Sequence, residues 1–279
     1  MKILIVIVLY KFKLKDVIPL KSLQFQLSEY RDRVCFYIYD NSPCPDDDGV
    51  GNNFLLGCPL KFISDSSNPG LSKPYNEACK YAEKNNWEWL LLLDQDTSLP
   101  ANFLSVYFEG LEKECSYNMF VPKVKVEGRG YMSPCLFFHK RGRFMKDVQT
   151  GKLATQNYTV INSGLLVNVQ AYKACGGYSE KVYLDYNDHE FFNRFKAFNP
   201  YIYVLNTELI QDFTSLSKDR AVLIRRFTVL CQCVRAIEKK SFSDRIDYFM
   251  MILRRAIHLI VLTKSAIFFK IFFSNYLKS

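Results

Sequence analysis

Short, continuous apolar runs that alternate with helix-like segments constrain the fold of this chain more than any other feature. The runs Ile3–Leu9, Val34–Tyr39 and Trp87–Leu93 are almost free of charge, and Pro19–Tyr30 and Pro74–Asn85 between them have helical spacing. Uniformly apolar strands of this length are typical of parallel sheets that are buried on both faces. The order of strand, helix and strand therefore predicts a parallel sheet covered by helices on both sides.

The following segments are expected to extend the same α/β domain into a mixed sheet flanked by helices. An acidic loop at 46–53 precedes a strand near Leu60–Ile63. Further strands are expected at Met119–Val126, Leu136–His139, Tyr158–Val169 and Ile202–Leu205. The nine cysteines contain no Cys-x-x-Cys pair, so we expect reduced thiols in a cytosolic protein.

One apolar strand is followed directly by two acidic residues, in the segment LLLLDQDTS at positions 90–98. On a strand, Asp94 and Asp96 would point the same way and Gln95 the opposite way. Two like charges at the end of a buried strand favour a cation between them, and Mg²⁺ commonly takes one or two carboxylates together with substrate phosphates. The alternative is that Asp96 caps a helix starting near Pro100.

Polar residues elsewhere in the first half are expected at the same rim, because ligands of such sheets bind beyond the carboxyl ends of the strands. Asp40 closes the second strand, and its alternative role is an Asx turn with the following Asn-Ser-Pro. Asn68, Gly70 and Asn76 form a polar loop that opens a helix. This arrangement suits close approach of the backbone to a phosphate or a sugar.

A second group of acids lies near the start of a helix expected at Asn187–Phe198. An apolar stripe faces the core, formed by Phe191, Phe195 and Phe198. Glu190 and Arg194 are four residues apart and can form an ion pair on another face. This pair leaves Asp188 unexplained, because Asp188 points inward at the helix N-terminus, where the helix dipole favours its ionised form.

Six motifs in the order of the chain resemble those of the inverting family 2 glycosyltransferases of the GT-A fold, in particular their rhamnosyltransferase-like branch. The motifs are YDNSP (39–43), the loop with Asn68, Gly70 and Asn76, LLLLDQDT (90–97), NSG (162–164), GGY (176–178) and YLDYNDHEFFNR (183–194). The resemblance covers about residues 1–213. It implies a GT-A, Rossmann-like domain and transfer of a sugar from a nucleoside-diphosphate sugar.

The resemblance also implies roles for the acids. Asp40 and the Asn68 loop hold the nucleotide, Asp94 contacts the ribose or the donor sugar, and Asp96, with Asp94, ligates Mg²⁺ or Mn²⁺ on the diphosphate. Asp188 is the base that takes the proton of the acceptor hydroxyl, and Asp185 is the alternate.

Two further features bear on the donor site. Asn162, Ser163 and Gly164 are expected close to the donor, with Gly164 allowing the approach; the alternative is a β-bulge. Gln211 stands where many members of the family have a histidine. Glutamine is a poorer ligand than imidazole for a transition metal, although it can hydrogen-bond a phosphate.

The C-terminal segment 214–279 is expected to be a basic, amphipathic helical extension of the domain at 1–213. It holds 13 Lys/Arg and 4 Asp/Glu, whereas residues 1–213 hold 24 of each. Apolar and basic residues at helical spacing suit an anionic membrane surface, and a helical cap on the domain is the alternative. Lys264 and Lys270 interrupt the apolar run, and no nucleic-acid recognition motif accompanies the charge.

Together these features predict transfer of a hexose or deoxyhexose from a UDP- or dTDP-linked donor to a saccharide acceptor that is linked to a lipid. The expected setting is bacterial surface polysaccharide synthesis, on the inner face of the cell membrane. A nucleotidyltransferase would also use Asp94 and Asp96 on a metal, but it gives Asp188 no role. The third possibility is a scaffold without catalysis that docks on a membrane.

Overall fold

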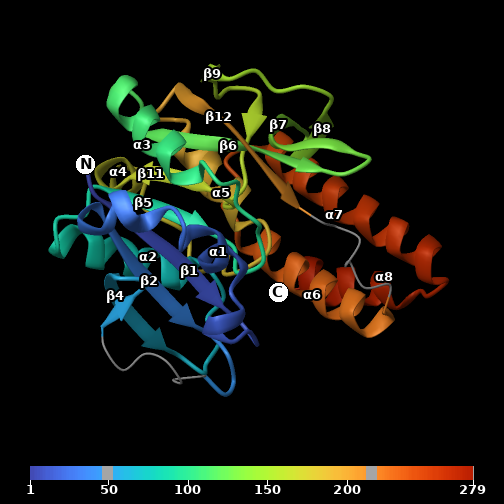
Figure 1. Ribbon diagram of the computed structural model, residues 1–279. Helices are drawn as coiled ribbons and strands as arrows, with labels where there is room; N and C mark the ends of the chain where they lie inside the picture. The colour runs from blue at the N-terminus through green and yellow to red at the C-terminus, as the bar shows by residue number, and fades with distance from the viewer. Residues whose placement is uncertain (46–52, 212–218, 279) are drawn as a thin grey trace.

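The computed structural model describes residues 1–45, 53–211 and 219–278, and its centre is a parallel sheet built from the N-terminal strands (Figure 1). Strands β1 (Ile3–Leu9), β2 (Val34–Asp40), β4 (Cys58–Ser64) and β5 (Trp89–Leu93) lie in the order β5-β1-β2-β4, and each neighbouring pair is parallel. Every residue of β1, β2 and β5 is buried. The predicted parallel sheet is therefore confirmed.

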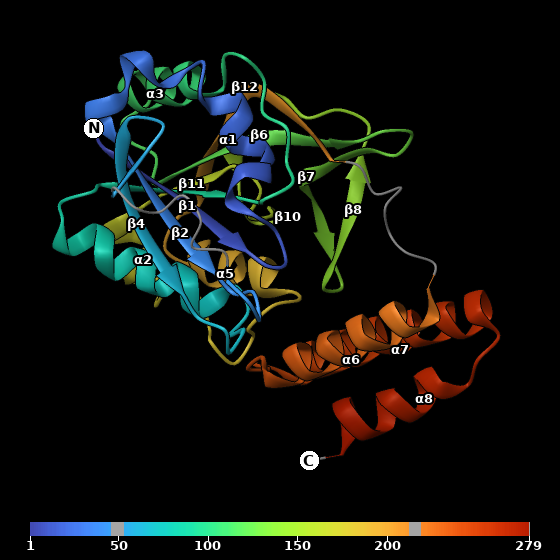
Figure 2. The ribbon, with the colours of Figure 1, turned by 60° about the horizontal axis from the view of Figure 1, so that its bottom comes forward.

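Helices cover both faces of this sheet, as the alternation of side chains along β1 shows. Ile3, Ile5 and Ile7 belong to an apolar cluster with α1 (Ile18–Leu23) and α3 (Phe103–Lys113). The intervening side chains belong to a second cluster, which includes α2 (Ser72–Lys84), α4 (Val169–Ala174) and α5 (Asn187–Phe195). In Figure 2, α1 and α3 lie on one side of the sheet and α2 and α5 on the other.

The second half of the domain adds strands that make the sheet mixed. The antiparallel strand β11 (Leu165–Asn168) lies between β5 and β6 (Met119–Val126). β12 (Tyr201–Gln211) runs parallel to β6 and antiparallel to β9 (Gly151–Ala154). In the described part of the chain the sheet has twelve strands, so the predicted mixed α/β architecture is confirmed.

A hairpin projects from the β6 edge of the sheet toward the C-terminal helices (Figure 1). β7 (Gly130–Phe138) pairs antiparallel with β6 and with β8 (Arg141–Met145). Short strands complete the sheet at Phe54–Leu55 (β3) and Tyr158–Thr159 (β10).

Several expected boundaries were wrong. The helix expected at 19–30 ends at Leu23 and continues as short 3₁₀ turns. Here the Gln26 side chain donates to the carbonyl of Pro100 (3.0 Å) and accepts from the amide of Leu104 (2.9 Å). The strand expected at 158–169 is divided into β10 and β11, with the NSG motif between them. The helix expected to reach Phe198 ends at Phe195.

The C-terminal helices form a layer with a core of their own. The helices are α6 (Arg220–Ala236), α7 (Phe242–Thr263) and α8 (Ile267–Ile271), followed by a π-helical turn at Phe272–Leu277. Their apolar cluster contains Phe227, Ile252 and Phe268, and it also includes Val182 of the sheet domain. None of the described helices combines the length and the apolarity that a membrane crossing requires.

Candidate active site

The two carboxylates of the DQD segment lie just beyond the end of β5, not on the strand as expected. β5 ends at Leu93, Asp94 is half-buried, and Asp96 is exposed in the following turn. The Gln95 side chain accepts a hydrogen bond from the Tyr10 amide (2.9 Å) and donates to the Tyr10 carbonyl (3.4 Å). Gln95 thus holds the loop after β1 against the end of β5 and fixes the turn that carries both acids.

The alternative role of Asp96 as a helix cap is wrong. The next helix, α3, begins at Phe103, and its N-cap residue is Asn102. Asp96 therefore lies too far along the chain to receive the first amides of α3.

Asp94 is the centre of a small polar network formed by residues from three separate segments. Its Oδ2 accepts a hydrogen bond from the Ser163 hydroxyl and a second from Gln211 Nε2 (3.3 Å). Gln211 also donates to the Ser163 hydroxyl oxygen (2.8 Å). Gln211, which occupies the expected histidine position, therefore contacts the predicted metal ligand.

Charges at this rim act on one another. The pKa of Asp94 is raised to about 6, mainly by burial; the negative charges of Asp96 and Asp188 add to this shift, whereas the hydrogen bonds from Ser163 and Gln211 oppose it. Asp94 thus lies within electrostatic reach of both other predicted acids. The fold brings together carboxylates that the sequence separates by about ninety residues.

Asp188 lies in the first turn of α5, and its side chain is 20% exposed. Its Oδ1 accepts from the amide of His189 (2.7 Å). The charge of Asp188 also contributes, after burial, to the raised pKa of Tyr75 and Tyr178 on the α2 side of the sheet. A partly exposed carboxylate at a helix N-terminus is suited to accept a proton from a bound hydroxyl.

The helix that carries Asp188 is fixed by its neighbours. The predicted pair of Glu190 and Arg194 is confirmed, with a shortest distance of 2.6 Å. The Arg194 guanidinium also donates to the carbonyls of Cys175 and Gly177, so it ties α5 to the GGY turn. Phe191 and Phe195 are buried as expected. Phe198 is 65% exposed, which contradicts its place in the stripe, and the buried Phe192 packs in its stead.

Asp185, the alternate base, faces the C-terminal helices. Burial raises its pKa, the nearby Asp188 adds to this shift, and the guanidinium groups of Arg226 and Arg255 oppose it. Asp185 therefore lies near two guanidinium groups of the C-terminal helices.

Asp40 and Asn41 link the ends of β1 and β2 to the Asn68 loop. Asp40 is buried, and its Oδ1 accepts from the amide of Ser42 (2.8 Å), so the Asx turn is present. The Asn41 side chain donates to the carbonyl of Gly70 (2.6 Å). Asn68 is exposed and has a positive φ of 51°. These bonds place the loop at the rim.

Gly70 and Asn76 have structural roles that were not predicted. A Cβ atom at Gly70, whose φ is +81°, would overlap the backbone carbonyl of Tyr183. The Asn76 amide donates to the Tyr178 carbonyl (2.9 Å), and its oxygen accepts from the Tyr172 hydroxyl (2.7 Å) and the Tyr178 amide (2.9 Å). The close approach at Gly70 is thus made by protein backbone.

The NSG motif forms the turn before β11, and its three residues are held by the interior. Asn162 accepts from the Tyr178 hydroxyl (2.5 Å), and its amide donates to Asn187 Oδ1 (3.4 Å). Ser163 bonds Asp94. A Cβ at Gly164 would lie 2.7 Å from Pro122, so packing against the interior requires glycine there.

Sequence reasoning missed the buried hydrogen bonds that join this motif to α5 and α2. From Asn187 they continue to the Ser72 hydroxyl (3.4 Å), which donates to the Val182 carbonyl (2.7 Å). The only signal in the sequence is the polar Asn before Asp188 in an otherwise apolar setting.

The acids at the rim fit a divalent cation that is completed by a substrate. Among the residues that the structure describes, no group of three or more His, Cys, Asp or Glu side chains could hold a metal ion. Asp94 and Asp96 can therefore supply at most two carboxylates. Oxygen donors in this number suit Mg²⁺ or Mn²⁺ bound together with phosphate oxygens and water. Burial is the main cause of the raised pKa of Asp94, and the negative charges of Asp96 and Asp188, which such a cation would offset, add to it.

Comparisons with known proteins agree with this geometry. No protein-family model matches the chain. The dTDP-rhamnosyl transferase RfbF of Shigella flexneri is 24% identical over 182 residues, which cover 61% of this chain and 57% of that protein. The chain thus matches a little more than half the length of this curated relative.

Solved structures with a similar fold include complexes with nucleotide sugars. TarS 1-349 of S. aureus in complex with UDP-GlcNAc has a TM-score of 0.59 at 14% identity, covering 99% of this chain and 79% of its own. The mannosyltransferase PcManGT of Pyrobaculum calidifontis, in complex with GDP-Man and Mn²⁺, has a TM-score of 0.59 at 13% identity, covering 94% and 73%. The chain therefore has the GT-A fold with a C-terminal helical extension. The predicted resemblance to rhamnosyltransferase-like glycosyltransferases is confirmed.

Proposed function

We propose that this chain is an inverting glycosyltransferase of family 2 that moves a hexose or deoxyhexose from a nucleoside-diphosphate sugar to a saccharide acceptor. The donor is UDP- or dTDP-linked, in keeping with the donor named for RfbF and with the UDP-GlcNAc complex of TarS. The acceptor is linked to a lipid, and the product is a bacterial surface polysaccharide.

One observation carries the proposal. Asp94, bonded by Ser163 and Gln211, lies at the carboxyl end of a GT-A sheet within electrostatic reach of Asp96 and Asp188. A donor diphosphate needs positive charge beside it, and an acceptor hydroxyl needs a base on the other side of the sugar. The site offers ligands for the first requirement and Asp188 for the second.

Each residue then has a task. Asp40 and the Asn68 loop hold the nucleotide, Asp94 contacts the ribose or donor sugar, and Asp96 is the main metal ligand. A bound Mg²⁺ or Mn²⁺ would offset the charge of the departing nucleoside diphosphate. Asp188 takes the proton from the acceptor hydroxyl as that oxygen attacks the anomeric carbon, which inverts the configuration.

Calorimetry with UDP and dTDP, with and without Mn²⁺, tests the donor site. We expect one nucleoside diphosphate to bind, and its affinity to fall at least about tenfold when Asp96 is changed to Asn, because a carboxylate ligand is lost. Glu127→Gln, in the exposed β6–β7 turn, is the matched control and should leave binding unchanged. Binding that needs neither the metal nor Asp96 would contradict the metal assignment, and no binding at all would favour the scaffold.

The C-terminal helices are proposed to rest on the anionic inner face of the cell membrane, which supplies the acceptor. Large apolar side chains of α7 and of the last turns are exposed, among them Ile257 (45%), Val261 (74%) and Phe273 (54%). Lys264 and Lys270 lie in the same stretch of chain. Exposed apolar side chains together with basic residues favour binding to an anionic bilayer.

Flotation of the full chain with vesicles of phosphatidylglycerol tests this surface. The double variant Val261→Asp/Phe273→Asp should lose vesicle binding, while Phe25→Asp, on the other part of the molecule, should keep it. Phe25 is 82% exposed, so its substitution adds the same kind of charge without disturbing a core. Equal flotation of the double variant and the wild type would refute the membrane proposal.

A further inference from the structure

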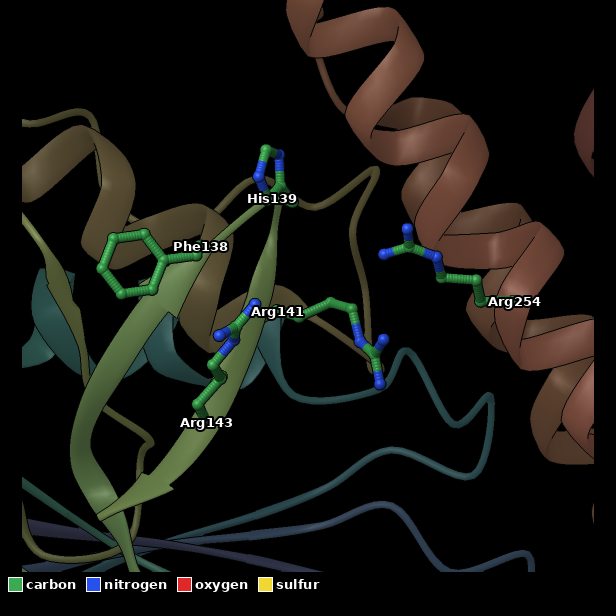
Figure 3. Close-up of a pocket in the computed structure, with 6 residues that line it drawn as sticks. Phe138, His139, Arg141, Arg143 and Arg254 are labelled. Carbon is green, nitrogen blue, oxygen red and sulfur yellow. The ribbon is translucent and has the colours of Figure 1, made fainter.

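A basic pocket lies between the β7–β8 hairpin and α7 (Figure 3). Its volume is about 260 Å³, and its lining consists of Phe138, His139, Arg141, Gly142, Arg143 and Arg254. This volume is many times the roughly 10–15 Å³ that one water molecule needs. In Figure 3, the guanidinium groups of Arg141 and Arg254 extend toward each other from the two walls. The pocket can therefore hold a ligand larger than water, and its lining carries only positive charge.

A hydrogen bond and an ion pair join the two walls. His139 Nδ1 lies 3.0 Å from Asp247 of α7, and Lys140 Nζ lies 2.6 Å from Asp244 of the same helix. The Lys140 side chain also lies over the ring of Tyr248, 5.0 Å from its centroid. The tip of the hairpin is thus clamped to the first turns of α7, which keeps the pocket in place.

The clamp uses the nearby acids and leaves the arginines unpaired. Within the described ranges 1–45, 53–211 and 219–278, Arg141, Arg143 and Arg254 form no ion pair with a carboxylate. The Arg143 guanidinium lies over the ring of Phe138, 5.6 Å from its centroid. Unpaired guanidinium groups in one pocket repel each other, and they bind phosphate in a two-pronged geometry. The pocket therefore favours an anion with several oxygen atoms.

The pocket also adjoins the predicted base. The hydroxyl of Tyr186, two residues before Asp188, donates to the carbonyl of Lys140 at the tip of the hairpin (2.7 Å). The Thr159 hydroxyl, on the strand beside β7, lies 2.8 Å from His189 Nδ1. Arg255 follows Arg254 in the chain, and its pKa is lowered mainly by burial. The charges of Arg226 and Arg141 lower this pKa further, and that of Asp185 opposes the shift, so all three lie near Arg255. Positive charge thus extends from the pocket to the segment that carries both predicted bases.

We propose that this pocket binds a phosphate or diphosphate group of the acceptor, next to the sugar whose hydroxyl reacts. The proposal rests on the proposed function, because it places an acceptor beside Asp188. It deepens that function in naming the chemistry of the acceptor: the sugar is joined to its carrier through phosphate. Arg141, Arg143 and Arg254 hold the phosphate oxygens, and the clamp formed by His139 and Lys140 positions the hairpin wall.

Calorimetry on the full chain in EDTA tests the pocket apart from the donor site, because without a metal ion the donor site should not hold a diphosphate. The probes are inorganic diphosphate, a short-chain prenyl diphosphate and vesicles of phosphatidylglycerol. The variant Arg141→Gln/Arg143→Gln/Arg254→Gln is compared with Lys80→Gln/Lys84→Gln/Arg129→Gln, which removes three exposed cations that have no ion pair among the described residues. Circular dichroism establishes that both variants fold.

We expect the arginine variant to lose affinity for both diphosphate probes by about tenfold or more, since several charge-assisted hydrogen bonds disappear. The control variant should stay within about twofold of the wild type, because its cations lie elsewhere. Unchanged affinity in the arginine variant, or no diphosphate binding by the wild type, would overturn the proposal. Vesicle binding that the arginine variant loses, together with no binding of prenyl diphosphate by the wild type, would also overturn it, because it would assign the pocket to a lipid headgroup. The proposed function survives either result if metal-dependent binding of the nucleotide persists.

Discussion

The contact between Gly70 and Tyr183 gives a prediction that separates a packing role of this glycine from a ligand-binding role. Gly70 has a φ of +81°, and a Cβ atom would overlap the Tyr183 carbonyl. That carbonyl accepts hydrogen bonds from the amides of Leu71 (2.7 Å) and Ser72 (3.2 Å). Gly128 has a φ of +71° and no atom within 4 Å of the same position, so Gly128→Ala is the matched control.

The expected costs follow from these two settings. Gly128→Ala should cost about 1 kcal/mol, the penalty for an alanine in the left-handed region. Gly70→Ala adds a clash with rigid backbone, about 1–3 kcal/mol, and the weakening of a hydrogen bond, about 1 kcal/mol. We therefore expect a total of about 3–5 kcal/mol. The excess over Gly128→Ala, about 2–4 kcal/mol, corresponds to a further fall in Tm of roughly 4–16 °C for a chain of this size.

Urea denaturation followed by circular dichroism measures both variants. Gly70→Ala should lower the midpoint much more than Gly128→Ala, and the slope should stay the same if only the native state is strained. Equal midpoints would refute the packing role and would favour the expected role of Gly70 in binding the donor. A stable Gly70→Ala protein with weakened nucleotide binding would support the original expectation.

Two further predictions concern bonds near the rim. Hydrogen bonds from Ser67, then Lys73 and the Tyr39 hydroxyl, hold the pKa of Asp65 well below its usual range. A lowered pKa stabilises the fold above the unfolded value near 4, so Asp65→Asn should cost about 1–2 kcal/mol at pH 7 and progressively less toward pH 3, measured by urea denaturation at each pH. Tyr178→Phe leaves the buried Asn162 oxygen without this donor and should cost about 1–3 kcal/mol, whereas the exposed Tyr201→Phe should change little. Equal midpoints for the two tyrosine variants, or a constant Asp65→Asn cost at every pH, would contradict these assignments.

The sequence predicts the buried half of the fold well, because local pattern and tertiary position agree there. β1 matches its expected bounds, Ile3–Leu9, and β6 matches Met119–Val126. β5 is two residues shorter than expected, since the chain enters it through a bond from the Trp89 amide to the Lys2 carbonyl. Uncharged strands must be buried on both faces, and a parallel sheet covered by helices buries them in this way.

The hairpin and the rim are harder to predict, since tertiary contacts determine them. The turn between β7 and β8 has positive φ at His139 and Lys140, and neither residue type signals such a turn. His139 and Lys140 contact Asp247 and Asp244 of α7, which lie more than one hundred positions later in the chain. The acidic loop at 46–53, apart from Asn53, and the start of the basic segment at 214–218 lie outside the described residues.

The candidate site shows the same division. The motifs identify Asp94, Asp96 and Asp188 as a group, and the structure places Asp94 within electrostatic reach of the other two. The sequence could not reveal that Gln211 donates to Asp94, or that Asn76 and Gly164 are engaged by the interior. Those roles depend on which segments meet, and residue type alone does not determine that.

The variant Asp188→Asn tests the central claim most directly, with Asp185→Asn beside it. Transfer from the nucleotide sugar that the wild type uses and affinity for its nucleoside diphosphate are measured on the same preparations. We expect Asp188→Asn to lower the transfer rate by at least about a hundredfold, the contribution of a general base, and to leave nucleotide affinity within about twofold. Transfer that survives in Asp188→Asn, or that collapses only in Asp185→Asn, would contradict the account.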